Sequence, residues 1–306
     1  MTAPDAIPVP SADPVPLPPP NPFARIRARW IFIGWLGLGV LAIAILEMIP
    51  ATRGTGTSLI GAGTIQYAAL ALIIARAGRR AGLHWPWLFG PPLEQDHMKL
   101  LAVVFPVAAV SLGSYTLFWG PLSYVIPEFV QQWAVEGLPE LLTPGDPIRM
   151  VAEGIIIVVI APVMEEILFR GVLLHRWSYR WGLRAGIIVT SLLFGVIHVE
   201  PVGHFFFGVV MCALYLATGS LWVPIAAHVL NNGIVMLVML PGALRGETVE
   251  TPTLDDIRGD WGEAIALVAV GMTILIWFLR RYLRIRGAVP PYVARAAAAA
   301  APSREG

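Results

Sequence analysis

Long apolar runs separated by short charged loops limit what this chain can fold into. Most of these runs have no polar face that could meet water, and about 20 apolar residues are what a helix needs to cross a hydrocarbon core. We identify eight such segments, at residues 30–49, 58–75, 100–118, 149–174, 185–199, 204–217, 221–240 and 261–279. The sequence therefore predicts an all-α polytopic membrane protein with about eight transmembrane helices. The fifth and sixth segments are short and could form one re-entrant or broken pair.

Composition excludes several other classes of protein. Only 13% of the residues are charged, whereas a soluble domain carries roughly a quarter. The net charge of +1 and the lack of a basic, aromatic-interleaved stretch give no indication of a nucleic-acid partner. The single Cys212 excludes an intrachain disulfide framework and a metal site built on several thiolates.

Low-complexity tails flank the apolar part of the chain. Residues 1–22 are Pro-rich and are expected to be disordered, and prolines replace the basic and apolar regions of a signal peptide. Residues 287–306 form an Ala-rich tail, also expected to be disordered. The transmembrane domain is therefore expected at residues 23–286, with a core at 149–240 that carries the polar residues discussed below.

Basic residues gather in alternate loops. They precede the first segment, follow the second, lie between the fourth and fifth, and follow the eighth, namely Arg25, Arg27, Arg29, Arg76, Arg79, Arg80, Lys99, Arg176, Arg180, Arg184, Arg280, Arg281, Arg284 and Arg286. The loops after the third and seventh segments are mainly acidic. Lys and Arg favour the cytoplasmic side, so this pattern predicts an even number of helices with both termini in the cytoplasm.

Ionisable and amide side chains interrupt four of the apolar segments. Such groups are costly inside a membrane and usually mark functional sites. They are Glu165, Glu166, Arg170, His198, His204, His228, Asn231 and Asn232. The alternative is that they only join helices by hydrogen bonds, which we would favour for one isolated histidine. For His204 we favour a core histidine over an auxiliary ligand.

Helical spacing sorts the charged residues of the fourth segment. Glu166 and Arg170 are four residues apart, so they share one helix face and can pair. Glu165 points about 100° away from Glu166 and is left without that partner. The sequence therefore predicts one carboxylate committed to an ion pair and one available for chemistry.

The same spacing brings the other polar residues together. His228 and Asn232 share a face of the seventh segment, and Phe194 and His198 share a face of the fifth. Counted from the predicted cytoplasmic ends, the polar residues lie roughly 10 to 21 Å deep. We therefore expect three helices to place a carboxylate, two imidazoles and an amide at one level of the membrane.

Three short motifs in these segments resemble the motifs of a known family. EEILFR at residues 165–170, FGVIH at 194–198 and HVLNN at 228–232 resemble the Glu-Glu-x-x-x-Arg, Phe-x-x-x-His and His-x-x-x-Asn motifs of the CAAX-protease and bacteriocin-processing family. Each motif alone is weak, but the ordered set is specific. The resemblance covers roughly residues 151–240 and implies an intramembrane endopeptidase.

Residue roles follow from the resemblance and not from the spacing. It implies that Glu165 is the general base that activates water, with His198 as its partner on that water. It implies that Glu166 and Arg170 form a structural pair. Peptide hydrolysis needs such an activated water together with stabilisation of the oxyanion that develops.

The oxyanion donors implied by the resemblance are His228 and Asn232. The metal dependence of the family is disputed, and a zinc alternative stays open, because Glu165, His198 and His228 could bind zinc and activate water through it. A zincin helix is excluded because no His-Glu-x-x-His occurs. We favour activation by Glu165, since Glu166 is assigned to Arg170 and no other carboxylate at this level could orient a histidine ligand.

Three functions are compared. The first is an intramembrane endopeptidase acting on a membrane protein or lipidated peptide in the lipid bilayer, in the cytoplasmic (inner) membrane of a bacterium. The second is a non-catalytic relative that serves as a membrane scaffold or a bacteriocin self-immunity protein. The third is an ion-coupled transporter, which the lack of internal repeats disfavours. The full set of polar residues favours the enzyme.

Overall fold

The structure, a computed structural model, describes residues 21–49, 56–135, 146–245, 253–259, 261–283, 285 and 287–301. Every regular element within these ranges is helical, which confirms the predicted all-α class. The predicted tail at residues 1–22 lies almost entirely outside the described residues.

Six helices in the described ranges are long and apolar enough to cross a membrane by length and composition. Three belong to the first half of the chain: α1 (Ala28–Met48), α2 (Gly56–Ala81) and a continuous stretch made of α4 (Gln95–Met98), η2 (Lys99–Val103) and α5 (Val104–Val125). The other three are α11 (Pro201–Thr218), α12 (Trp222–Leu244) and α14 (Trp261–Tyr282).

The predicted fourth segment lies in a long helical stretch over residues 147–181. Its parts are α7 (Pro147–Ile155), η4 (Ile156–Ile160), α8 (Ala161–Glu166), η5 (Ile167–Leu173) and α9 (Leu174–Trp181). Both η4 and η5 are π-helical, a form that occurs mostly as single turns and often at functional sites. Pro162 has no N–H to continue the α-helical ladder, and η4 lies just before it. The two acidic residues of the first motif therefore lie between two widened turns.

The fifth predicted segment is shorter than a span. Helix α10 (Leu183–Val196) has 14 residues and is about 21 Å long, below the roughly 30 Å of a hydrocarbon core. It ends before His198, although the sequence predicts that this segment continues to residue 199. A tight turn over 197–200 leads into α11. His198 is thus on a turn between two helices and not on a helix face.

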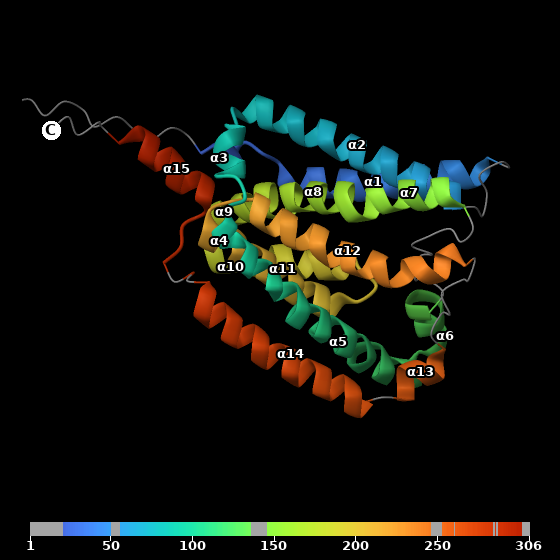
Figure 1. Ribbon diagram of the computed structural model, residues 1–306. Helices are drawn as coiled ribbons and strands as arrows, with labels where there is room; N and C mark the ends of the chain where they lie inside the picture. Colours follow the sequence, from blue (N-terminus) through green and yellow to red (C-terminus); the bar gives the residue numbers. More distant parts are fainter. Residues whose placement is uncertain are drawn as a thin grey trace, which may run out of the picture.

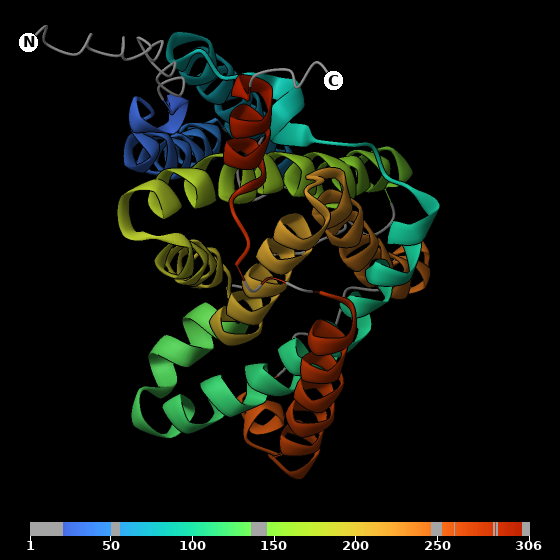
Figure 2. The ribbon, with the colours of Figure 1, turned by 90° about the vertical axis from the view of Figure 1, so that its left-hand side faces the viewer.

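The helices are arranged in layers (Figure 1). Helices α1 and α2 pack together on one side, and α5 and α14 pack together on the opposite side. The stretch from α7 to α9 and helices α10, α11 and α12 lie between these two pairs, as the end-on view also shows (Figure 2). All three motifs therefore lie in the middle layer, between the two outer pairs.

Short elements cover the two ends of the bundle. At one end lie α3 (Trp85–Phe89), α9 and α15 (Pro291–Ala300), together with η1 (Pro22–Ala24). At the other end lie α6 (Pro127–Val130), η3 (Gln131–Val135) and α13 (Leu254–Gly259). The last turns of α2 and α14 carry Arg79, Arg80, Arg280 and Arg281 at the first end, and α13 begins with Asp255 and Asp256 at the second.

The C-terminal segment differs from the prediction. Residues 291–300 form α15 instead of a disordered tail, because two side chains anchor this helix. Arg295 donates to the carbonyl oxygens of Trp87 and Gly219 at 2.7 and 2.6 Å. The Tyr292 hydroxyl accepts from the His84 backbone N–H at 3.1 Å. Composition gave no signal of these contacts.

Reporter fusions test the predicted topology. A reporter that is active only outside the cytoplasm should give no signal when fused to the C-terminus, because the basic clusters favour the cytoplasmic side. The same reporter fused after Asp256 should give a signal, because α13 lies at the opposite end of the bundle from α15. Immunoblotting of both fusions controls for expression, and the reverse pattern would invert the topology.

Candidate active site

Two adjacent carboxylates form the centre of the candidate site. Glu165 and Glu166 are the last residues of α8, and their exposed fractions are 6% and 0%. Glu166 Oε1 accepts from Arg170 Nη1 at 2.7 Å, so the contact predicted from the spacing is present. Arg170 is itself buried and also donates to the Gly208 carbonyl oxygen of α11 at 3.1 Å. The pair therefore ties the first motif to a neighbouring helix.

His228 joins the two carboxylates. Its Nδ1 lies 2.9 Å from Glu166 Oε1, the atom that also binds Arg170. Its Nε2 lies 4.0 Å from Glu165 Oε2. An ionised carboxylate can only accept hydrogen bonds, so Nδ1 carries a proton and Nε2 faces Glu165. The expectation that Glu166 serves Arg170 alone is therefore wrong, because the same carboxylate orients His228.

Tyr67 is a site residue that sequence analysis missed. Its hydroxyl donates to Glu165 Oε1 at 2.7 Å, from α2 in the outer layer. No motif includes this position, and a lone tyrosine in an apolar segment is not distinctive. Only the packing of α2 against the motif helix gives it a partner, so each oxygen of Glu165 now has a neighbour of its own.

Phe194 is the apolar hub of the site. Its ring is completely buried. Ring centroids lie 4.5 Å away in His198 and 5.9 Å away in His228, and the Arg170 guanidinium lies 4.9 Å from the Phe194 centroid. The phenylalanine of the second motif thus contacts a residue from each of the three motifs.

His198 is held by the end of its own helix. Its Nδ1 lies 2.6 Å from the Phe194 carbonyl oxygen, and a carbonyl can only accept, so this nitrogen is the donor. No hydrogen bond or ion pair joins His198 to Glu165 within the described ranges. The predicted pairing of the two on one water therefore has no direct contact in the structure.

The amide of Asn232 is already occupied. Its Nδ2 donates to the Ile157 carbonyl oxygen at 2.9 Å, and its Oδ1 accepts from Asn231 at 3.2 Å. Ile157 belongs to η4, so this contact ties α12 to the π-helical turn before Pro162. The Asn232 side chain therefore connects two helices in this structure.

The residues proposed for zinc do not converge as ligands. Glu165 and His228 are 4.0 Å apart, but no group of three His, Cys, Asp or Glu side chains in the described part of the chain is placed to hold a metal ion. The donor set in this arrangement does not fit a three-ligand zinc site. The orientation of His228 by Glu166 nevertheless removes our sequence argument against zinc, since a carboxylate does orient this histidine.

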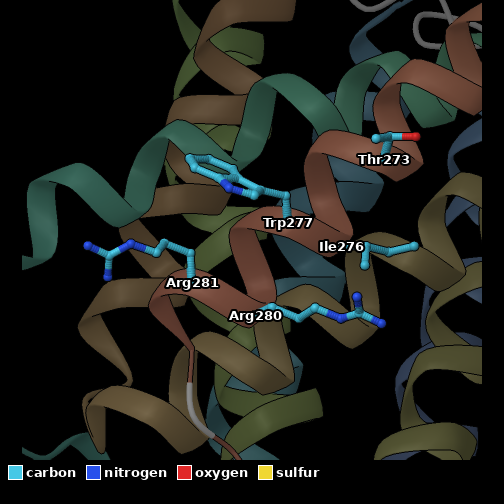
Figure 3. Close-up of a pocket in the computed structure, with 5 residues that line it drawn as sticks. All are labelled: Thr273, Ile276, Trp277, Arg280 and Arg281. Carbon is cyan, nitrogen blue, oxygen red and sulfur yellow. The ribbon is translucent and has the colours of Figure 1, made fainter.

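Grooves at the surface lie away from these residues. One of about 560 Å³ follows the basic end of α14 and is lined by Thr273, Ile276, Trp277, Arg280 and Arg281. Figure 3 shows the two arginines extending in different directions from α14. A second groove, of about 430 Å³, lies between α14 and the start of α5. Neither contains a motif residue, so neither is the candidate site.

Comparisons with known proteins support the resemblance. The model of a family described as type II CAAX prenyl endopeptidase Rce1-like matches residues 147–234, which hold all three motifs. The chain is also similar to the Bacillus subtilis (strain 168) protein named "Putative membrane peptidase YdiL", with 28% identity over 85 residues. That match covers 27% of this chain and about a third, 35%, of YdiL. No solved structure gives a significant match.

The membrane-length helices and the matched family agree on the class of protein. Six helices suit a bilayer by length and composition, and the chain is a polytopic integral membrane protein. The matched region begins with α7 and ends inside α12, so it contains the carboxylate pair, Arg170, both motif histidines and Asn232. On these grounds, residues 147–234 of the chain are similar to the type II CAAX prenyl endopeptidase Rce1-like family.

Proposed function

We propose that this protein is an intramembrane endopeptidase that uses water activated by Glu165. The observation that carries the proposal is the placement of Glu165 Oε2 opposite His228 Nε2 at 4.0 Å, in a buried site. This separation is too long for a direct hydrogen bond, and it suits one water that bonds to both atoms. Such a water would have a carboxylate on one side and an imidazole on the other.

The hydrolysis would proceed in two steps. Glu165 takes a proton from the water while the oxygen of that water attacks the peptide carbonyl carbon. This attack gives a tetrahedral oxyanion. The C–N bond then breaks, and the leaving amine takes the proton from Glu165. Tyr67 holds Glu165 Oε1, so Oε2 remains directed at the water.

In this proposal His228 has a donor role, with a proton on each of its ring nitrogens. Both nitrogens then donate, Nδ1 to Glu166 and Nε2 toward the oxyanion. Asn232 would complete the oxyanion site only through its second N–H, because the first is bound to Ile157.

The proposed substrate is a membrane-associated or lipidated protein or peptide. A site buried in the middle layer of a membrane protein is reached most directly by a chain that already lies in the bilayer. Proteomics of membrane fractions from cells that carry the wild type or Glu165→Ala should reveal one or more proteins that persist uncleaved only in the variant. Purified protein should then cleave a peptide spanning the identified bond.

Two outcomes of these experiments would contradict the proposal. Identical membrane proteomes, together with no cleavage by the purified wild type, would favour the non-catalytic scaffold or self-immunity protein. Substrate flux into liposomes without cleavage would favour the transporter.

Removing the Tyr67 hydroxyl tests how Glu165 is held. Tyr67→Phe should lower kcat about tenfold or more, because a hydrogen bond to a charged group contributes about 1.5–3 kcal/mol. The ring remains, so KM should change little, and the loss of stability should stay within the same range of about 1.5–3 kcal/mol. Tyr179→Phe, at an exposed tyrosine of α9, is the matched control. A Tyr67→Phe enzyme with wild-type kcat would show that the contact does not position the base.

A further inference from the structure

A second polar cluster lies behind His198, at the turn between α10 and α11. Glu200 caps α11, accepting from the backbone N–H groups of Gly203 at 2.7 Å and His204 at 3.2 Å. The Ser114 hydroxyl of α5 donates to the same carboxylate at 2.9 Å. The Glu200 side chain is 9% exposed. A carboxylate this buried, with three donors from two helices, is a rigid anchor.

His204 connects this anchor to the candidate site. Its Nδ1 lies 2.7 Å from the Glu200 carbonyl oxygen and 3.4 Å from Glu200 Oε2. Its ring lies flat on the ring of His198, with centroids 4.1 Å apart and planes 11° from parallel. His204 is therefore fixed along one edge by Glu200, and one of its faces covers His198.

Two rings contact His198 as a result, and their own centroids lie 6.0 Å apart, so they are neighbours and not on opposite faces of His198. Phe194 lies at 4.5 Å and His204 lies 4.1 Å away, while Nδ1 binds the Phe194 carbonyl. Because His198 lies on a turn beyond the end of α10, helical geometry alone does not fix its ring. A second hydrogen bond from α5 to this turn, from Trp119 Nε1 to the Val199 carbonyl oxygen at 2.9 Å, holds the turn itself.

We propose that His204, fixed by Glu200, is a positioning residue that sets the ring plane of His198 and keeps its Nε2 directed at the substrate. This inference rests on the proposed function and adds a residue outside the three motifs. Ser114, Glu200, His204 and His198 then form one series of contacts from α5 to the site. The interpretation of His204 as an ordinary core residue does not explain a hydrogen-bonded ring stacked on a motif histidine.

Two variants separate stacking from simple bulk. His204→Ala removes the covering ring and should lower kcat about 10- to 100-fold, the effect expected when a reacting group loses its alignment, with KM nearly unchanged. His204→Phe keeps a flat ring without the Nδ1 contact and should recover part of that loss. His84→Phe, at a histidine beside α3 that belongs to none of the motifs, should behave as wild type.

The assay uses the full-length protein in nanodiscs and a fluorogenic peptide that carries a farnesylated cysteine near its C-terminus. NMR spectra of the same protein with ¹³C-labelled histidine give a second reading that needs no substrate. The wild type should show one sharp His198 ring resonance, and His204→Ala should show a shifted or doubled one, with His204→Phe between them. Assignment uses His198→Gln, which removes that resonance.

The outcomes distinguish this inference from the proposed function. If the wild type does not cleave the peptide, the proposed substrate class fails, and the His198 resonance alone decides on the positioning role. A His204→Ala protein with wild-type kcat or an unchanged His198 resonance overturns the inference. Equal loss of thermal stability in both His204 variants, without recovery by His204→Phe, would show a purely structural role and would also overturn it.

Discussion

Glu165→Gln should reduce cleavage at least about 100-fold, the lower end of what loss of a general base costs. Glutamine has nearly the same volume and can still accept from Tyr67, so the fold should survive. It cannot take a proton from water near neutral pH, so the nucleophile is not formed. Initial rates of the purified variant on the peptide found by proteomics measure the effect, and scanning calorimetry or thermal aggregation checks the fold.

Glu153→Gln is the matched control for this substitution. Glu153 is another buried glutamate of the same helical stretch, in α7, and it belongs to none of the motifs. Its replacement should leave cleavage near the wild-type rate. Near-normal cleavage by Glu165→Gln would contradict its role as the base.

The same assay tests the zinc alternative. Protein stripped with a strong chelator should keep its activity in metal-free buffer if Glu165 activates water by itself. Loss of cleavage on stripping, recovery with one equivalent of zinc, and elemental analysis giving about one zinc per chain would overturn this choice. The ligands would then have to move, because they do not converge in the structure.

Arg170→Ala should destabilise the protein by about 3–5 kcal/mol, the cost of leaving one partner of a buried ion pair alone. Arg170 is 1% exposed and Glu166 is 0% exposed. Loss of the Arg170 guanidinium leaves His228 as the hydrogen-bond partner of the Glu166 carboxylate. It also removes the donor to the Gly208 carbonyl oxygen. Expression, thermal stability and cleavage should therefore fall together. Thermal aggregation of the purified protein in detergent provides the stability measurement.

Arg280→Ala is a suitable control, because this arginine lies exposed at the end of α14 and its loss should change stability little. Arg170→Lys adds a second comparison. It restores a positive charge but not the planar fork that reaches both Glu166 and Gly208, so it should recover only part of the stability. A stable but inactive Arg170→Ala protein would instead assign Arg170 a direct role in the reaction.

Local periodicity determined what the sequence could predict about the site. Residues four apart on a helix face one another whatever surrounds them, so the contact between Glu166 and Arg170 could be predicted from spacing alone. The same rule predicted that Glu165 does not pair with Arg170, and in the structure the ion pair of Arg170 is with Glu166. It failed for His198, because the prediction assumed a helix where α10 has already ended at Val196.

Contacts between distant segments could not be predicted in this way. Tyr67 lies 98 residues before Glu165, and Glu200 lies 86 residues after Ser114. Nothing in the local pattern marks either partner, because the chain between them can follow many routes. The same limit applies to His228, whose contact with Glu166 spans 62 residues and changes the role assigned to that carboxylate.

The sequence by itself determined the all-α membrane class, the motif set and the pairing of neighbours on one helix, since hydropathy and helical spacing are local properties. The tertiary structure decided which groups share the site. It gave Glu165 a tyrosine from α2, gave Glu166 a histidine as well as an arginine, and stacked His204 on His198. Those choices depend on how the helices pack, and packing is set by the whole bundle and not by any one segment.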